Sequence, residues 1–137
     1  MAIEVDARSK RERRGPKLWR VDAPPGSHAE IFRAARAAGV RLGWLELETT
    51  VAMPADLEEA ASEGVLRAVS VAGGRSVAVK PMAGEPVLRD LLREHFRGCK
   101  AVLVRGAVEA EELRRVEGGW KVGEGEAVSA EELIADL

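Results

Sequence analysis

The sequence predicts an α+β fold, a single two-layer domain with a mixed β-sheet and helices packed mainly on one face. Three helix-like stretches end at Gly39, Gly64 and Gly98, and an apolar, strand-like run follows each. Glycine is favoured just past a helix because that position usually needs a positive φ. Gly73-Gly74 separates two strand-like runs, which is typical of a hairpin with a type I′ turn, and a second hairpin is expected around Gly118-Gly119. Helices joined to strands by short connections favour parallel neighbours, whereas hairpins require antiparallel ones, so the sheet should be mixed.

The first part of the chain predicts an arm, a strand and a helix. Residues 1–16 have no hydrophobic period and end at Gly15-Pro16, so we expect a flexible basic arm before one globular domain over residues 17–137. Residues 17–22 can form a first strand. Ser27 and Glu30 have capping-box spacing and predict the start of a helix. The apolar face of this helix is expected to comprise Ile31, Phe32, Ala35 and Ala38.

The middle of the chain predicts two strands and a short helix, followed by a hairpin turn. Residues 42–49 alternate in polarity, with Leu45 on one face and Trp44, Glu46 and Glu48 on the other. Residues 55–63 form a short helix that carries acidic residues in its first turns. Strands over residues 66–71 and 76–80 flank Gly73-Gly74 and form the first predicted hairpin.

The last part predicts a helix, three strands and a final short helix. Glu85-Pro86 starts the clearest helix, and its apolar stripe comprises Leu88, Leu91, Leu92 and His95. Residues 101–104 are apolar on both faces, which indicates a central strand. Residues 113–117 and 120–122 form the second hairpin, and Ser129 with Glu132 caps the last helix. The predicted element order is βαβαββαβββα.

Composition excludes several classes of protein. The length of 137 residues suits one domain, and the single cysteine, Cys99, excludes an internal disulfide. No apolar run is long enough for a membrane span, and the N-terminus lacks the apolar stretch of a secretory signal, so we expect a cytoplasmic protein without a membrane partner. Asn, Gln and Tyr are absent and arginine greatly outnumbers lysine. This pattern is typical of a thermophile, although codon bias in a GC-rich genome has the same effect.

The charges are distributed unevenly, and this suggests possible partners for the basic residues. Residues 1–20 carry seven bases and three acids, while residues 107–137 carry nine acids and three bases. The basic start can therefore meet the acidic end in the same chain or in another subunit, or it can bind nucleic acid. Candidate contacts for nucleic acid or another anion lie in the arm and on one stripe of the long helix: Arg11, Arg13, Arg14, Lys17, Arg89, Arg93 and Arg97.

Candidate catalytic and metal-binding residues do not form a recognisable set. His95 and Cys99 have a spacing that could place two ligands on one helix face, with His28 as a third, but the glycine between them and the missing fourth ligand argue against a metal site. We expect His95 to lie at the edge of the core and Cys99 to be inert. His28, an exposed histidine in the first turn of its helix, should be neutral near pH 7 and could act as a base. Glu46 and Glu48 alternate onto one strand face and could do acid–base work, although an outward, charged face of an edge strand is commoner. The sequence predicts no cofactor and identifies no small-molecule ligand.

The leading functional hypothesis is a small non-catalytic module that acts by protein association, with a second copy of itself as the most plausible partner. Tryptophan is enriched at interface hot spots, so the candidate interface residues are Trp19, Trp44 and Trp120. One alternative is a nucleic-acid or ribosome-associated protein that uses the basic arm. The other is a small enzyme that uses His28 or His95 with strand carboxylates.

Overall fold

The computed structural model describes residues 15–47, 53–65, 67–82 and 84–137, so most of the predicted arm lies outside the described residues. The elements follow in this order: β1 (Lys17–Val21), α2 (Ala29–Ala38), β2 (Leu42–Glu46), α3 (Ala55–Ser62), β3 (Ala68–Ala72), β4 (Arg75–Val79), α4 (Leu88–His95), β5 (Ala101–Arg105), β6 (Glu111–Val116), β7 (Gly119–Val122) and α5 (Ala130–Ala135). The α+β class is confirmed. Among the described helices, none is both long and apolar enough to cross a bilayer.

The chain divides into two compact units. The first, here called the sheet unit, comprises Met1–Glu48 and Arg89–Leu137, and the second, the hairpin unit, comprises Thr49–Leu88. The hairpin unit is therefore an insertion between β2 and α4.

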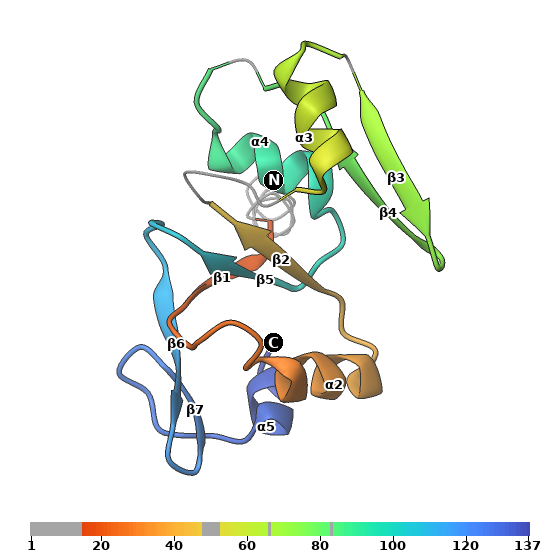
Figure 1. Ribbon diagram of the computed structural model, residues 1–137. Coiled ribbons are helices and arrows are strands. Elements are labelled where there is room, and N and C mark those ends of the chain that lie inside the picture. Colours follow the sequence, from red (N-terminus) through yellow and green to blue (C-terminus); the bar gives the residue numbers. More distant parts are fainter. Residues whose placement is uncertain (1–14, 48–52, 66, 83) are drawn as a thin grey trace, which may run out of the picture. The chain divides into compact units, whose positions relative to one another are not determined.

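The sheet unit contains a five-stranded mixed sheet with the strand order β2-β5-β1-β6-β7 (Figure 1). Strands β2, β5, β1 and β6 run parallel to one another, and β7 is antiparallel to β6. The predicted central strand is β5, because Ala101, Val102, Leu103 and Val104 are all fully buried. β2 and β7 form the two edges of the sheet.

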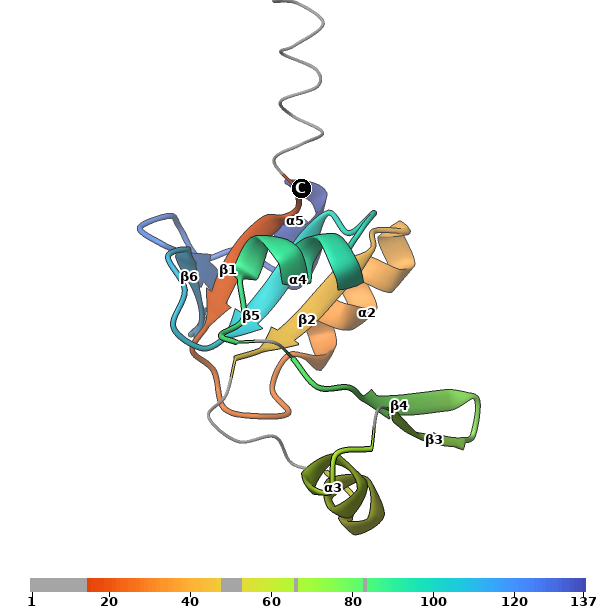
Figure 2. The same ribbon diagram turned by 90° about the horizontal axis from the view of Figure 1, so that it is seen from above.

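Two helices of the sheet unit, α2 and α5, cover one face of this sheet, and α4 covers the other. The core lies between the sheet and helices α2 and α5, and it includes Ile31, Leu103, Trp120 and Ile134. α4 lies on the opposite face (Figure 2). On that side Gly43 has no room for a side chain, because a Cβ there would overlap the Phe96 ring. The end of α4 thus packs closely against β2.

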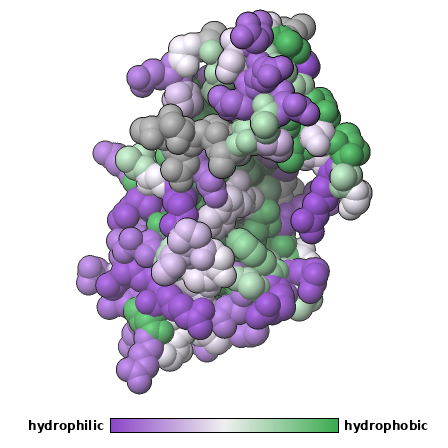
Figure 3. Space-filling view, viewed as in Figure 1, coloured by the Kyte–Doolittle hydropathy of each residue, from purple (hydrophilic) through white to green (hydrophobic). Residues whose placement is uncertain are grey.

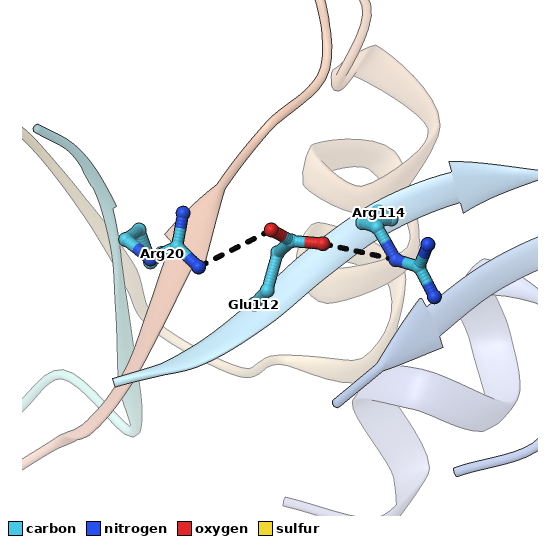
Figure 4. A network of polar contacts seen from close by, with 3 residues as sticks. All are labelled: Arg20, Glu112 and Arg114. Atoms are coloured by element: carbon cyan, nitrogen blue, oxygen red, sulfur yellow. Dashed lines mark hydrogen bonds and ion pairs between the residues drawn. The ribbon is translucent and has the colours of Figure 1, made fainter. Parts of the chain in front are cut away.

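Pairing of β1 with β6 brings the basic start of the chain against its acidic end. Glu112 accepts a hydrogen bond from Arg20 at 3.2 Å and forms an ion pair with Arg114 at 2.9 Å (Figure 4). Lys17 lies 3.8 Å from Glu111. These pairs are partly or fully exposed, so each stabilises the fold by less than about 1 kcal/mol. Lys17 and Arg20, the bases of the predicted basic start that lie within the described residues, thus pair with acidic residues of the same chain.

The hairpin unit consists of α3 and the two-stranded antiparallel sheet β3–β4. Gly73 and Gly74 have φ values of 57° and 75°, as a type I′ turn requires. Ala68 and Val79 face each other across the hairpin and are the partly buried residues of its two strands. The other described strand residues are exposed, so this small sheet has little core of its own.

The expected helix ends are confirmed, but one predicted helix start is wrong. Gly39, Gly64 and Gly98 have φ values of 69°, 81° and 83°. Ser27, in contrast, caps no helix: α2 begins one residue later, with His28 at the N-cap position and without a side-chain cap. The Ser27 hydroxyl instead donates to the Pro24 carbonyl. A Pro-Pro-Gly turn provides this local acceptor, which competes with the cap.

The second predicted capping box, at Ser129, is present. A comparison of Ser129, which caps a helix, with Ser27, which does not, tests these two assignments. Ser129 Oγ accepts from the Glu132 amide at 3.1 Å, and Glu132 accepts from the Ser129 amide. We expect Ser129→Ala to lower the free energy of unfolding by about 1 kcal/mol in urea titrations. Ser27→Ala is the matched control and should cost clearly less. Equal losses in the two variants would contradict this assignment.

Candidate functional site

A groove in the sheet unit runs between α2 and the edge strand β2, and we call it the α2–β2 groove. It consists of two hollows of about 370 and 460 Å³ that share Phe32 and Trp44. The first is also lined by Gly26, His28, Ala29 and Glu46, and the second by Ala35, Arg36, Val40, Leu42 and Gly43. Over the region that α2 and β2 occupy in Figure 1, Figure 3 shows pale and green residues lying together.

Two aromatic side chains form the middle of the groove. Leu42, Trp44 and Glu46 alternate onto the face of β2 that lies beside α2. Phe32 meets Trp44 edge-to-face, with ring centroids 5.8 Å apart. Phe32 and Ala38 were predicted on the apolar face of this helix, but Phe32 is 43% exposed and Ala38 is also exposed. Ile31, Ala34 and Ala35 form the buried face of α2. The groove therefore offers apolar surface next to the open edge of the sheet.

His28 closes the groove at the start of α2. Its side chain is 2% exposed, which contradicts the expected exposed histidine. The ring stacks on Trp120 at a centroid distance of 5.5 Å and tilts against Trp44 at 5.1 Å. Its Nε2 is buried and has no hydrogen-bond partner within the described residues. Burial, and to a smaller extent the charge of Arg105, lower the pKa of His28 below 6.5, so the imidazole is neutral near pH 7.

Two charged residues end the groove at the carboxyl ends of β2 and β5. Glu46 and Arg105 are paired neighbours in the sheet register. Glu46 accepts a hydrogen bond from the Trp44 indole at 3.0 Å. Arg105 lies over the Trp44 ring at 5.6 Å and donates to the Ala23 carbonyl at 2.8 Å. These contacts hold Trp44 in place, and they leave the exposed Glu46 carboxylate at one end of the groove.

Two of the three tryptophans predicted at an interface lie in the core instead. Trp19 is 2% exposed and Trp120 is fully buried, so neither can contact a partner. The Trp120 indole donates to Glu30 at 2.6 Å, and Glu30 also forms an ion pair with Arg115 at 3.4 Å. Only Trp44 of the three lies in the groove. Sequence alone does not separate these cases, because all three tryptophans lie on strands.

The predicted basic contacts do not come together as one described surface. Lys17 pairs with Glu111 on the sheet, and Arg11, Arg13 and Arg14 lie outside the described residues. Arg89, Arg93 and Arg97 are exposed. α4 ends before Arg97, whose side chain donates back to the Arg93 carbonyl at 3.2 Å. The expected three-residue stripe thus has two members on the helix and one bound to its end.

The remaining candidates, His95 and Cys99, do not form a site with His28. His95 is exposed beside Glu94 at 3.8 Å, so its expected place at the edge of the core is wrong. Cys99 is a free, partly buried thiol two residues before β5. Across the described residues, no three His, Cys, Asp or Glu side chains are grouped to hold a metal ion.

The sequence did not predict the exposure of Phe32 or the contact of Arg105 with the Trp44 ring. Phe32 follows the helical period of the core, so its sequence position gives no signal of exposure. Arg105 ends a buried strand, and the carboxyl ends of parallel strands are where sites commonly form in such sheets. The sequence matches no protein-family model, and none of the curated proteins is significantly similar to it.

The lowered pKa of His28 predicts a pH dependence of stability. Below pH 6.5 the unfolded chain binds a proton at this position, while the folded chain does so only at lower pH. The free energy of unfolding should therefore fall as the pH drops from 7 to 5, by about 1.4 kcal/mol for each unit by which folding lowers this pKa. In denaturant titrations across this range, His28→Phe should show a smaller decrease, because phenylalanine keeps the ring but does not titrate. The same decrease in both proteins would contradict the assignment.

Proposed function

We propose that this chain is a small non-catalytic association module and that one copy binds another through the α2–β2 groove. A strand from the partner would extend the sheet at the edge of β2 and place alternate side chains in the groove. This mode of recognition combines main-chain hydrogen bonds with side-chain pockets. The observation that carries the proposal is the apolar, aromatic groove directly beside an open strand edge.

The exposure pattern of the sheet unit supports this location. Phe32 is the large apolar side chain that is clearly exposed in its described residues, and it lies in the groove. Trp44 is partly buried against its own chain and keeps surface for a partner, as interface anchors do. The residues of β2 carry no proline, and its one charged residue, Glu46, lies at the end of the strand. Edge strands that avoid pairing usually carry such blocking residues along their length.

A small enzyme remains the second candidate, because His28 and Glu46 line the same hollow. A neutral histidine and a carboxylate are the usual groups for general acid–base catalysis. However, His28 Nε2 is enclosed by the surrounding side chains, and a substrate would need the ring to move before it could reach this atom. The apolar lining of the groove therefore favours association over catalysis.

Light scattering and sedimentation equilibrium over a micromolar concentration range test the proposal. The wild-type chain should have a mass above that of the monomer at both low and high salt, because the contact is largely apolar. Phe32→Ser and Trp44→Ala should each shift association to at least about tenfold higher concentration, since interface anchors commonly contribute more than 1 kcal/mol.

Lys121→Glu, on the opposite edge strand β7, is the matched control and should associate like the wild type. Circular dichroism and thermal unfolding establish that each variant is folded. A wild-type monomer at every concentration would refute the proposal.

A further inference from the structure

We infer that the segment bound in the α2–β2 groove is β3 of a second copy, paired antiparallel with β2. This inference rests on the proposed function and names the partner strand. It explains a second feature of the chain, the exposed apolar hairpin. Val69, Val71 and Val77 are 57%, 72% and 51% exposed. In a two-stranded sheet both strands have an open edge, and such a hairpin is at best marginally stable by itself.

The hairpin also lacks the features that normally prevent strand pairing. β3 and β4 contain no proline, and Arg75 is their one charged residue. Basic residues flank them at Arg67 and Lys80, and no acid occurs between these two positions. A strand with exposed valines and basic ends favours an acceptor that is apolar along its length and acidic at one end. The α2–β2 groove has this arrangement, with Glu46 at its end.

The side-chain pattern of β3 matches that of β2 in one antiparallel register. Val69 and Val71 share one face of β3, and Arg67, which directly precedes the strand, continues this alternation in the sequence. Leu42, Trp44 and Glu46 alternate in the same way onto the groove face of β2. Setting Val69 opposite Trp44 places Val71 opposite Leu42 and Arg67 opposite Glu46. Aromatic–valine pairs and opposite charges are favourable cross-strand neighbours.

The other face of β3 also fits this register. Ser70 and Ala68 would lie opposite Gly43 and Leu45. The Phe96 ring covers Gly43 on this face, and the small side chains of Ser70 and Ala68 would add little bulk beside it. The side chains on both faces of β3 are therefore compatible with those of β2 in this register.

The strand β4 has the same alternation of one arginine and two valines as the Arg67–Val71 segment, with Arg75, Val77 and Val79 on one face. Val79 on this face is partly buried within the hairpin unit, as is Ala68 opposite it. The Val69–Val71 face of β3 is more exposed, so β3 is the better donor. Arg67 and Arg75 therefore provide the variants that separate the two strands.

A charge exchange tests the register directly. Glu46→Arg and Arg67→Glu should each weaken self-association by about tenfold, because each creates a like-charge pair at the contact. The protein that carries both substitutions should recover most of the wild-type affinity. Arg75→Glu combined with Glu46→Arg is the matched control and should not recover it. Recovery with Arg75→Glu in place of Arg67→Glu would overturn the assignment of β3.

A mixing experiment tests whether the hairpin and the groove come from different copies. A groove variant, Trp44→Ala, and a hairpin variant, Val69→Ser with Val71→Ser, should each be largely monomeric alone. Mixed together they should form a heterodimer, because one supplies the intact hairpin and the other the intact groove. Sedimentation velocity with one variant fluorescently labelled measures this complex, and circular dichroism checks that both variants are folded.

The outcomes separate this inference from the proposed function. If the hairpin variant associates like the wild type while the groove variant does not, copies meet through the groove without β3, and the inference is overturned alone. If the groove variant also associates like the wild type, both proposals fail. The absence of a heterodimer in the mixture would likewise overturn the pairing of β3 with β2.

Discussion

The burial of β5 is the constraint on which the sheet unit depends. All side chains from Ala101 to Val104 are fully buried, and they alternate between the two faces of the sheet. A strand with apolar residues on both faces is stable only where other elements cover both. This requires β1 and β2 as its neighbours, α2 and α5 on one face, and α4 on the other. Because β2 forms the outer neighbour, its free edge lies beside α2, and the groove results from this order.

The aromatic cluster around His28 restrains Trp44 at the boundary between the core and the groove. His28 lies between Trp44 and Trp120, and its unpaired Nε2 costs stability of about 1–3 kcal/mol. Stacking of neutral rings offsets part of this cost. Arg105 and Glu46 restrain Trp44 from the other side. An aromatic side chain held in this way loses little conformational freedom when a partner binds it.

The hairpin unit shows a different distribution of apolar residues. Its valines are exposed, although they follow the alternation of a strand that has one face buried. The unit spans only Thr49–Leu88 and includes one short helix, α3, whose single buried side chain is Leu57. So small a unit cannot cover both faces of its sheet. Pairing of β3 with β2 of a second copy would cover the exposed valines of the hairpin and fill the α2–β2 groove.

The sequence by itself determined the helices, the strands and the positions where they end. Residues such as Gly39, Gly73 and Ser129 act through their own backbone or their nearest neighbours, so their effects can be predicted locally. Only the tertiary structure decided which apolar residues are buried. Trp19, Trp44 and Trp120 all lie on strands, yet the order of the strands places two in the core and one in the groove. The exposure of Phe32 and the burial of His28 depend in the same way on contacts between residues far apart in the chain, which no local pattern records.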